Sequence, residues 1–273
     1  MSNDMRSEVR RHYARTAGME VRGGDSCCST GCCASGAAEA RADRRGYTEQ
    51  QLMAIPAESD MGLGCGNPTA LGSIQPGETV VDLGSGGGID CFLAAEKVGP
   101  NGRVIGVDMT PEMIDRARAA ARRNGRGNVE FRLGEIESLP VADSSADVII
   151  SNCVINLSTE KARVFREAAR VLKPGGRLMI SDIMLRENLP GRLRSNAALF
   201  AGCVAGAILE EDYLRLMREA GLREVTVLQE KETAEMFGPE EAASLRSQAP
   251  DLTAEELAQL GRAIVSVQVT ARK

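Results

Sequence analysis

The sequence predicts an α/β fold in which a mostly parallel β-sheet has helices on both faces. From about residue 79 onward, short apolar runs rich in β-branched residues alternate with segments of helical pattern. This alternation is typical of consecutive βαβ units, whose strands are parallel. The run Val148-Ile149-Ile150 is apolar throughout, as expected of a strand that is buried on both faces. The first strand ends in glycines that lead directly into a helix.

Residues at the ends of the segments support the individual elements. Thr110 is a natural N-cap for the helix that starts at Pro111, and Gly221 follows the last residue of a later helix. Pro174 and Gly175 stop a third helix. The expected strands are Thr79–Leu83, Arg103–Val107, Val129–Leu133, Asp147–Ser151, Arg177–Ser181, Val225–Leu228 and Ile264–Thr270. The expected helices are Ile89–Val98, Pro111–Asn124, Glu160–Leu172 and Glu210–Ala220, with Glu240–Ser247 and Thr253–Arg262 as a helical cover between the last two strands.

Residues 1–60 lack this alternation and are expected to form a small irregular N-terminal region, followed by one domain over residues 61–273. Short helices are expected over Arg6–Arg15 and Gly46–Ala57. Between them lies the stretch GGDSCCSTGCCASGAAEA, which has the period of neither a helix nor a strand.

Composition narrows the function classes. The 273 residues are 43% hydrophobic and 26% charged, which is ordinary for a globular protein. A net charge of −5, with no apolar run of membrane-spanning length and no apolar leader, predicts a cytoplasmic protein with no nucleic-acid or membrane partner. The single histidine, His12, argues against a histidine metal cluster or a Ser-His-Asp triad. The eight cysteines of such a chain favour metal-binding, redox or catalytic thiols over structural disulfides.

Four short motifs follow one another along the predicted sheet. They are VVDLGSGGG (80–88), GVD (106–108), GEIESLP (134–140) and LKPGGRL (172–178). A glycine run alone also occurs as a plain turn between a strand and a helix. A dinucleotide-binding dehydrogenase would carry GxGxxG instead and would lack the LKPGG turn. A carboxylate about 20 residues beyond the first glycine, here Asp108, can accept the hydroxyls of an adenosine ribose.

Together these motifs resemble those of the class I S-adenosylmethionine-dependent methyltransferases, over residues 75–185. The resemblance implies a Rossmann-like fold with a seven-stranded, mostly parallel sheet and S-adenosylmethionine as the cofactor. It also implies that the methionine part and ribose contact Asp82, Gly84, Ser85 and Gly86, and that the ribose hydroxyls bind to Asp108. The adenine would lie against Met109, with its edge framed by Glu135 and Ile136, and the transfer site would be faced by Asn152. Core packing is the alternative for Met109 and Ile136.

Three cysteines occur near the predicted transfer site, in GLGCGNP (Cys65), SNCVINLS (Cys153) and GCVAGA (Cys203). Each alone could be a small buried hydrophobe, as we expect of Cys91 inside the first helix of the sheet. In combination with VDLGSGGGIDCFLAA and GVDMT, however, they resemble the arsenite methyltransferases over residues 60–215. The resemblance implies that Cys65, Cys153 and Cys203 bind As(III) and that the segment around residues 183–215 covers the site. Leu63 departs from the family, in which a tyrosine is common at this position.

The implied chemistry agrees with the composition. Trivalent arsenic is soft and thiophilic. Bound to three sulfurs it keeps a lone pair, so it can attack a methyl carbon without a general base. The implied activity is stepwise methylation of arsenite and methylated arsenicals, with glutathione or a thioredoxin system as thiol reductant.

The N-terminal cysteines, Cys27, Cys28, Cys32 and Cys33, allow three interpretations. The resemblance implies that one of them, for which we choose Cys28, forms a disulfide with Cys65 during turnover. A flexible capture site for arsenite is the second. A metal site such as zinc is the third, although adjacent cysteine pairs are poorly spaced for it.

Two other functions stay open at this point. One is methylation of a small organic acceptor by the same fold, with the cysteines merely packed. The other is a metalloid-binding protein without turnover. The apparent lack of a catalytic base and the three-cysteine pattern count against the first, and only a measured methyl transfer excludes the second.

Overall fold

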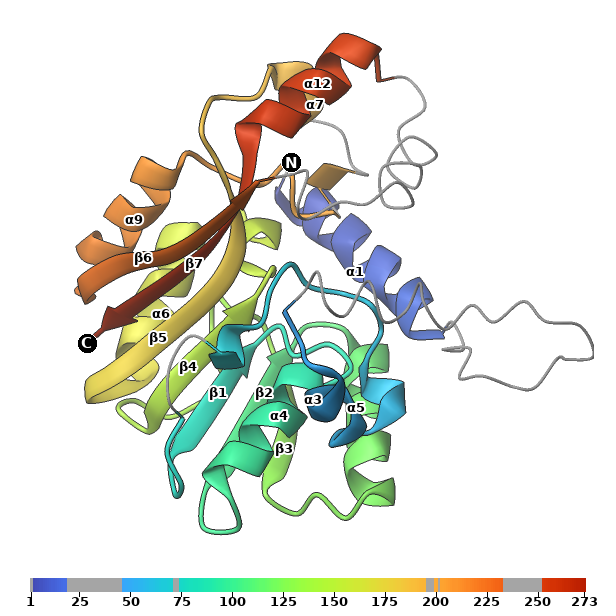
Figure 1. Ribbon diagram of the computed structural model, residues 1–273, viewed down its shortest axis with the longest axis vertical. Coiled ribbons are helices and arrows are strands. Elements are labelled where there is room, and N and C mark those ends of the chain that lie inside the picture. The colour runs from blue at the N-terminus through green and yellow to red at the C-terminus, as the bar shows by residue number, and fades with distance from the viewer. Residues whose placement is uncertain (1, 19–45, 71–73, 195–198, 201, 233–251) are drawn as a thin grey trace, which may run out of the picture.

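The computed structural model (Figure 1) describes residues 2–18, 46–70, 74–194, 199–200, 202–232 and 252–273. Within these residues the strands form a seven-stranded sheet of order β3-β2-β1-β4-β5-β7-β6. The strands are β1 (Thr79–Leu83), β2 (Arg103–Asp108), β3 (Val129–Leu133), β4 (Ala146–Asn152), β5 (Leu172–Leu185), β6 (Arg223–Glu232) and β7 (Ile264–Arg272).

The pairing of the strands confirms the predicted architecture. β1 pairs in parallel with β2 and β4, and the parallel ladder continues from β2 to β3 and from β4 to β5. Only β7 runs antiparallel to its neighbours β5 and β6. The carboxyl ends of β1, β2 and β4 therefore meet at one edge of the sheet, where parallel α/β proteins bind their ligands.

Helices cover both faces, as predicted (Figure 1). Successive residues of a strand point to opposite faces, so Val81 of β1 packs in one core and Val80 in the other. The first core includes side chains of α6 (Lys161–Val171) and α9 (Glu210–Glu219), and the second includes side chains of α4 (Ile89–Val98) and α5 (Pro111–Arg123).

A third core joins segments that are far apart in the sequence. It unites Val9 of α1 (Ser2–Gly18), Leu193 of α7 (Gly191–Arg194), Phe200, and Leu260 of α12 (Ala254–Ala263). Through it, α1 lies across the carboxyl edge of the sheet (Figure 1). Among the described residues, no helix combines the length and the apolar character that a membrane span requires.

Several expected boundaries are wrong. β5 is much longer than Arg177–Ser181, because backbone bonds between Gly176 and Lys273 carry its pairing back through the LKPGG turn, and Leu185 still pairs with Ile264. β6 is also longer than Val225–Leu228. The helix expected over Gly46–Ala57 is only α3 (Glu49–Met53), followed by the short helix η1 (Ala57–Ser59).

Three further comparisons with the predicted elements concern helices. α1 is longer than the expected Arg6–Arg15. The short helices η2 (Pro68–Ala70) and η3 (Ile155–Leu157) were not expected. The segment Glu240–Ser247 lies outside the described residues, whereas the neighbouring cover helix is present as α12.

Candidate active site

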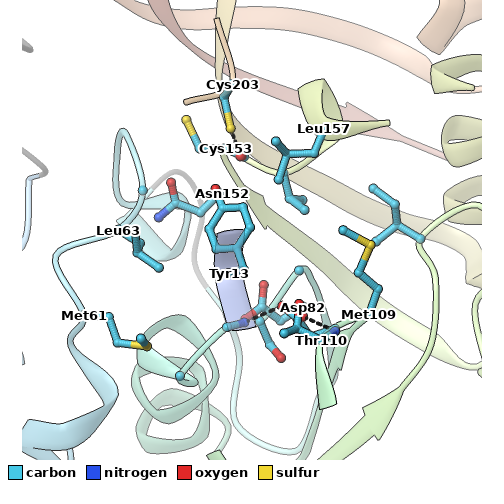
Figure 2. Close-up of a pocket in the computed structure, with 18 of the residues that line it drawn as sticks. Tyr13, Met61, Leu63, Asp82, Met109, Thr110, Asn152, Cys153, Leu157 and Cys203 are labelled. Carbon is cyan, nitrogen blue, oxygen red and sulfur yellow. Dashed lines mark hydrogen bonds between the residues drawn. The ribbon is translucent and has the colours of Figure 1, made fainter. Parts of the chain in front are cut away.

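A cavity of about 390 Å³ opens at the carboxyl ends of the parallel strands. It is lined by the glycine loop and by Asp82, Asp108 and Asn152, which lie in the last two residues of β1, β2 and β4. The three cysteines Cys65, Cys153 and Cys203 line the same cavity, so one space joins the two sets of residues that the sequence singled out. Figure 2 shows Asp82, Met109 and Thr110 in one part of it and Cys153 and Cys203 in another.

The glycine loop bends sharply back on β2. The backbone N–H groups of Gly84 and Ser85 both donate to the carbonyl oxygen of Val107, at 2.8 and 3.0 Å. Gly84 has φ +68°, and a Cβ at this position would lie 2.3 Å from Cγ2 of Val154. Gly86 has φ +50° but no atom within 4 Å of its would-be Cβ, so its backbone faces open space. The loop therefore requires glycine at Gly84 for packing and offers bare backbone at Gly86 for a ligand.

Asp108 is anchored to this loop. The backbone N–H groups of Gly86 and Thr110 donate to its two carboxylate oxygens, at 3.0 and 2.8 Å. Burial raises the pKa of Asp108, and these backbone donors counteract the rise because they stabilise the carboxylate form. Each oxygen keeps a lone pair beyond these bonds, so the carboxylate can accept hydrogen bonds from a pair of ligand hydroxyls.

Two more carboxylates make the cavity wall acidic. Asp82, which is 2% exposed, accepts a hydrogen bond from the thiol of Cys91 at 3.1 Å. Asp90 accepts one from the hydroxyl of Tyr47 at 2.8 Å. Burial and the neighbouring Asp90 raise the pKa of Asp82. Cys91 is fully buried, which confirms the prediction that it is a packed residue.

Asn152 connects the cofactor side of the cavity to the Cys65 loop. Its Oδ1 accepts from the backbone N–H of Cys65 at 3.1 Å, and its Nδ2 donates to the carbonyl oxygen of Gly66 at 2.7 Å and to Oδ2 of Asp90 at 3.0 Å. A Cβ at Gly64 would lie 2.8 Å from Nδ2 of Asn152. The amide thus fixes the position of the loop that carries Cys65.

The structure brings the three predicted arsenic ligands together. Cys65 and Cys153 are joined by a disulfide, with 5.9 Å between their Cα atoms. The thiol of Cys203 donates to the carbonyl oxygen of Cys153 at 2.7 Å (Figure 2). Cys153 and Cys203 have φ +55° and +64°, a left-handed backbone that non-glycine residues seldom adopt and that is frequent at functional sites.

The disulfide partner differs from the one that the family resemblance implies. We expected Cys28 to pair with Cys65, but Cys28 lies outside the described residues, and Cys65 is bonded to Cys153 instead. A cysteine forms one disulfide at a time, so the two pairings exclude each other in any one state.

Buried charges lie behind the cysteines. Burial raises the pKa of Asp182 to about 6 and lowers that of Lys161 to about 8. The ammonium group of Lys161 donates to the carbonyl oxygens of Ser158 and Gly206, at 2.9 and 2.6 Å. Burial first, and the carboxylate of Asp182 second, raise the pKa of the Cys203 thiol.

Helix α1 forms a roof over the cavity. Its Tyr13 ring lies in the middle of the cavity in Figure 2, between the cysteines and Asp82. Arg6 contacts Glu135 at 3.0 Å and Glu137 at 3.4 Å, and Arg10 contacts Glu135 at 3.4 Å. The side chain of Glu135 is thus turned to α1, while Ile136 and Glu137 belong to the described cavity lining.

Three residues of the site, Tyr13, Asp90 and Asp182, are not predicted from the sequence. Asp182 had a signal, because it lies near the carboxyl end of a predicted strand, as Asp82 and Asp108 do. Tyr13 had none, since its place depends on how α1 packs across the sheet.

Known proteins with similar sequences and structures identify the family. The Methyltransferase domain family matches residues 74–221. An arsenite methyltransferase of Halobacterium salinarum is 44% identical over 280 aligned residues, 99% of this chain and 67% of that protein. One of Aquipseudomonas alcaligenes is 45% identical over 177 residues, 62% of this chain and 50% of its own length.

A solved structure agrees with these relatives. The crystal structure of an arsenic(III) S-adenosylmethionine methyltransferase from Chlamydomonas reinhardtii is 35% identical and has a TM-score of 0.61. The similarity covers 86% of this chain and 72% of that one. The chain therefore belongs to the arsenite methyltransferases, within the S-adenosylmethionine-dependent methyltransferases of Rossmann-like fold.

Proposed function

We propose that this protein transfers methyl groups from S-adenosylmethionine to trivalent arsenic bound by Cys65, Cys153 and Cys203. The observation that carries the proposal is the single cavity that holds both the glycine loop with Asp108 and the three cysteines. The substrates would be arsenite and methylated arsenicals.

The residues of the cavity fit S-adenosylmethionine. Asp108 would accept the ribose hydroxyls, and the open backbone at Gly86 would lie against the cofactor. Ser85 carries a buried hydroxyl oxygen with no hydrogen-bond partner within the described residues, which a ligand could satisfy. A positively charged ligand would favour the ionised form of the buried Asp82 and Asp90, which line the same space. We propose that Gly84, Met109, Ile136 and Asn152 complete this half, and that Glu135 acts through its contacts with α1.

When bound, S-adenosylmethionine supplies an electrophilic methyl group. The chain's task is then to hold a nucleophile in line with that methyl group. Three cysteine sulfurs would hold As(III) with its lone pair free, so its attack on the methyl group would need no general base. Asn152 would hold the Cys65 loop in place, and Tyr13 and α1 would exclude water from above.

The thiols must be reduced before arsenite can bind. In the structure Cys65 and Cys153 are oxidised to a disulfide, which has no free thiol to offer. A thiol reductant, glutathione or a thioredoxin system, would open it by two electrons and two protons. The cytoplasm maintains such conditions, and we propose that the protein acts there. Pairing of Cys28 with Cys65 during turnover stays a prediction.

The test is a mixture of purified protein, labelled S-adenosylmethionine, arsenite and glutathione, with separation of methylated arsenic species. We expect methylarsenicals that depend on arsenite and are lost in Cys203→Ser. A parallel reaction with an organic acceptor tests the alternative methyltransferase. Arsenite binding by the reduced wild type without methyl transfer would instead indicate a sequestration protein.

A further inference from the structure

A buried carboxylate lies beside the sulfur atoms of the proposed arsenic site. Asp182 on β5 is 0% exposed. One of its carboxylate oxygens and the sulfurs of Cys65 and Cys153 all lie within 4.8 Å of one another. The methyl transfer proposed above assigns this carboxylate no part, although a buried charge is costly unless something offsets it.

Neutral donors fix the orientation of the carboxylate. The hydroxyl of Tyr213 donates to Oδ2 at 3.1 Å. The side-chain amide of Asn156 and the backbone N–H of Ile183 donate to Oδ1, at 3.0 and 2.9 Å. These donors stabilise the ionised form without cancelling its negative charge.

Lys161 is the cation whose charge acts on Asp182. Its ammonium hydrogen bonds go to two backbone carbonyl oxygens, those of Ser158 and Gly206. At the Cys203 thiol, Asp182 raises the pKa more than Lys161 lowers it. Because Lys161 bonds to carbonyl oxygens and not to the carboxylate, the negative charge of Asp182 stays beside the sulfurs of Cys65 and Cys153.

Arsenite binding and methyl transfer differ in how they change the charge at this site. When a thiol replaces a hydroxyl of arsenous acid, the thiol proton leaves with that hydroxyl as water, so the bound As(III) is neutral. In the transfer step, the arsenic lone pair forms the new As–C bond. The electron pair of the broken C–S bond stays on the cofactor sulfur. Arsenic is formally oxidised from III to V, and the positive charge of the sulfonium moves to arsenic.

We infer that Asp182 is a charge-stabilising residue that lowers the barrier of methyl transfer by stabilising the positive charge that develops on arsenic. This inference rests on the proposed function. A negative charge placed in advance where positive charge develops stabilises the transition state more than the ground state. Since bound As(III) is neutral, the same charge adds little to arsenite affinity. The same negative charge disfavours the thiolate form of Cys203.

The test variant removes the charge of the Asp182 side chain and keeps its shape. In Asp182→Asn, the amide oxygen still accepts from Asn156 and Ile183, and the amide nitrogen can donate to Tyr213. The matched control is Tyr213→Phe, which removes one hydrogen bond and keeps the carboxylate. Both proteins are reduced with a phosphine and checked by thermal unfolding. Single-turnover methyl transfer is measured at saturating S-adenosylmethionine with arsenite bound beforehand, and arsenite affinity by equilibrium dialysis.

A second readout needs no turnover. The rate of alkylation of Cys203 by iodoacetamide at fixed pH reports the thiolate fraction, and alkylation of the buried Cys91 reports any loosening of the fold. We expect Asp182→Asn to slow methyl transfer by about tenfold and to speed Cys203 alkylation by a similar factor. Arsenite affinity should stay within about twofold, and Tyr213→Phe should change each quantity by less than about threefold.

The outcomes separate the inference from the function on which it rests. An unchanged transfer rate in Asp182→Asn, beside an active wild type, would overturn the inference alone. So would a rate loss matched by an equal loss of arsenite affinity, or faster alkylation of Cys91 as well as Cys203. No transfer by the wild type would overturn the proposed function and this step with it.

Discussion

The two halves of the cavity are built in different ways. The centre of the cofactor half comes from one stretch of chain, residues 82–110, in which the glycine loop and Asp108 are tied together by backbone hydrogen bonds. The arsenic half is assembled from Cys65, Cys153 and Cys203, which lie in three distant segments. Cys153 and Cys203 have a left-handed backbone, which in the glycine loop of the other half occurs at glycines such as Gly84 and Gly86. Local sequence thus encodes the first half, and tertiary packing creates the second.

The largest effect should come from the arsenic half. Cys153→Ser is expected to abolish methyl transfer to arsenite, because serine offers a hard oxygen in place of a soft thiolate. Binding of S-adenosylmethionine should persist, since the glycine loop is untouched. Isothermal titration with the cofactor and product analysis of the full reaction measure the two properties separately.

A matched variant distinguishes the cluster from thiols in general. Cys91→Ser replaces a fully buried thiol outside the cluster and keeps a donor for Asp82. It should retain methyl transfer. Wild-type turnover in Cys153→Ser, or equal loss in both variants, would contradict the division of the cavity into two halves.

The same division determines which parts of the fold and the site can be predicted from the sequence. The strands β1 to β4 and the helices α4 and α5 follow from local patterns, and their predicted bounds agree with the structure to within one residue at each end. The three cysteines have no shared local pattern, so only the resemblance to a family pointed to them as a set. Tyr13 and Asp182 belong to the same half, and their positions depend on contacts between elements that no local pattern encodes.

The length of β5 is another feature that the local sequence does not predict. Proline and glycines predicted a turn over residues 172–176, and they do end α6. The chain nevertheless enters β5 at Leu172, because Leu172 pairs with Ala146 of β4 and the backbone of Lys273 bonds to Gly175 and Gly176. A long-range partner overrode a correct local signal.

The next largest effect should be a difference in stability between substitutions at two glycines of the cofactor half. Gly84→Ala places a Cβ 2.3 Å from Val154 and also forces alanine to φ +68°. Gly86→Ala meets only the strain of φ +50°. We expect Gly84→Ala to lower the free energy of unfolding by about 1–3 kcal/mol more than Gly86→Ala does, because overpacking adds to strain. Urea unfolding without cofactor measures the difference, and equal losses would show that Val154 simply moves aside.

Asn152 joins the two halves, and its removal should affect both. Asn152→Ala leaves the backbone N–H of Cys65, the carbonyl of Gly66 and the carboxylate of Asp90 without this partner. A cost of about 1–3 kcal/mol in the free energy of unfolding is expected. Because the Cys65 loop loses its support, the number of sulfurs bound to arsenic should fall from three to two.

X-ray absorption on the arsenite complex counts those sulfurs. Asn152→Asp is the informative companion, since it keeps an acceptor for Cys65 but places a second carboxylate against Asp90. Since it supports the backbone of Cys65 but loses the donor to Gly66, it should restore the third As–S bond only in part. Three As–S bonds in Asn152→Ala would show that the loop holds Cys65 by itself.

The smallest effect should come from the roof that spans both halves. Arg6→Ala removes the ion pairs of Arg6 with Glu135 and Glu137, while Arg10 of α1 keeps its pair with Glu135. Partly exposed pairs of this kind contribute about 0.2–1 kcal/mol each, so the Kd for S-adenosylmethionine should rise by only about two- to fivefold. The same pairs are screened by salt, so the wild-type affinity should fall with added salt more steeply than that of the variant. Equal salt dependence in the two proteins would mean that the apolar contact of Val9, not Arg6, holds α1 over the cavity.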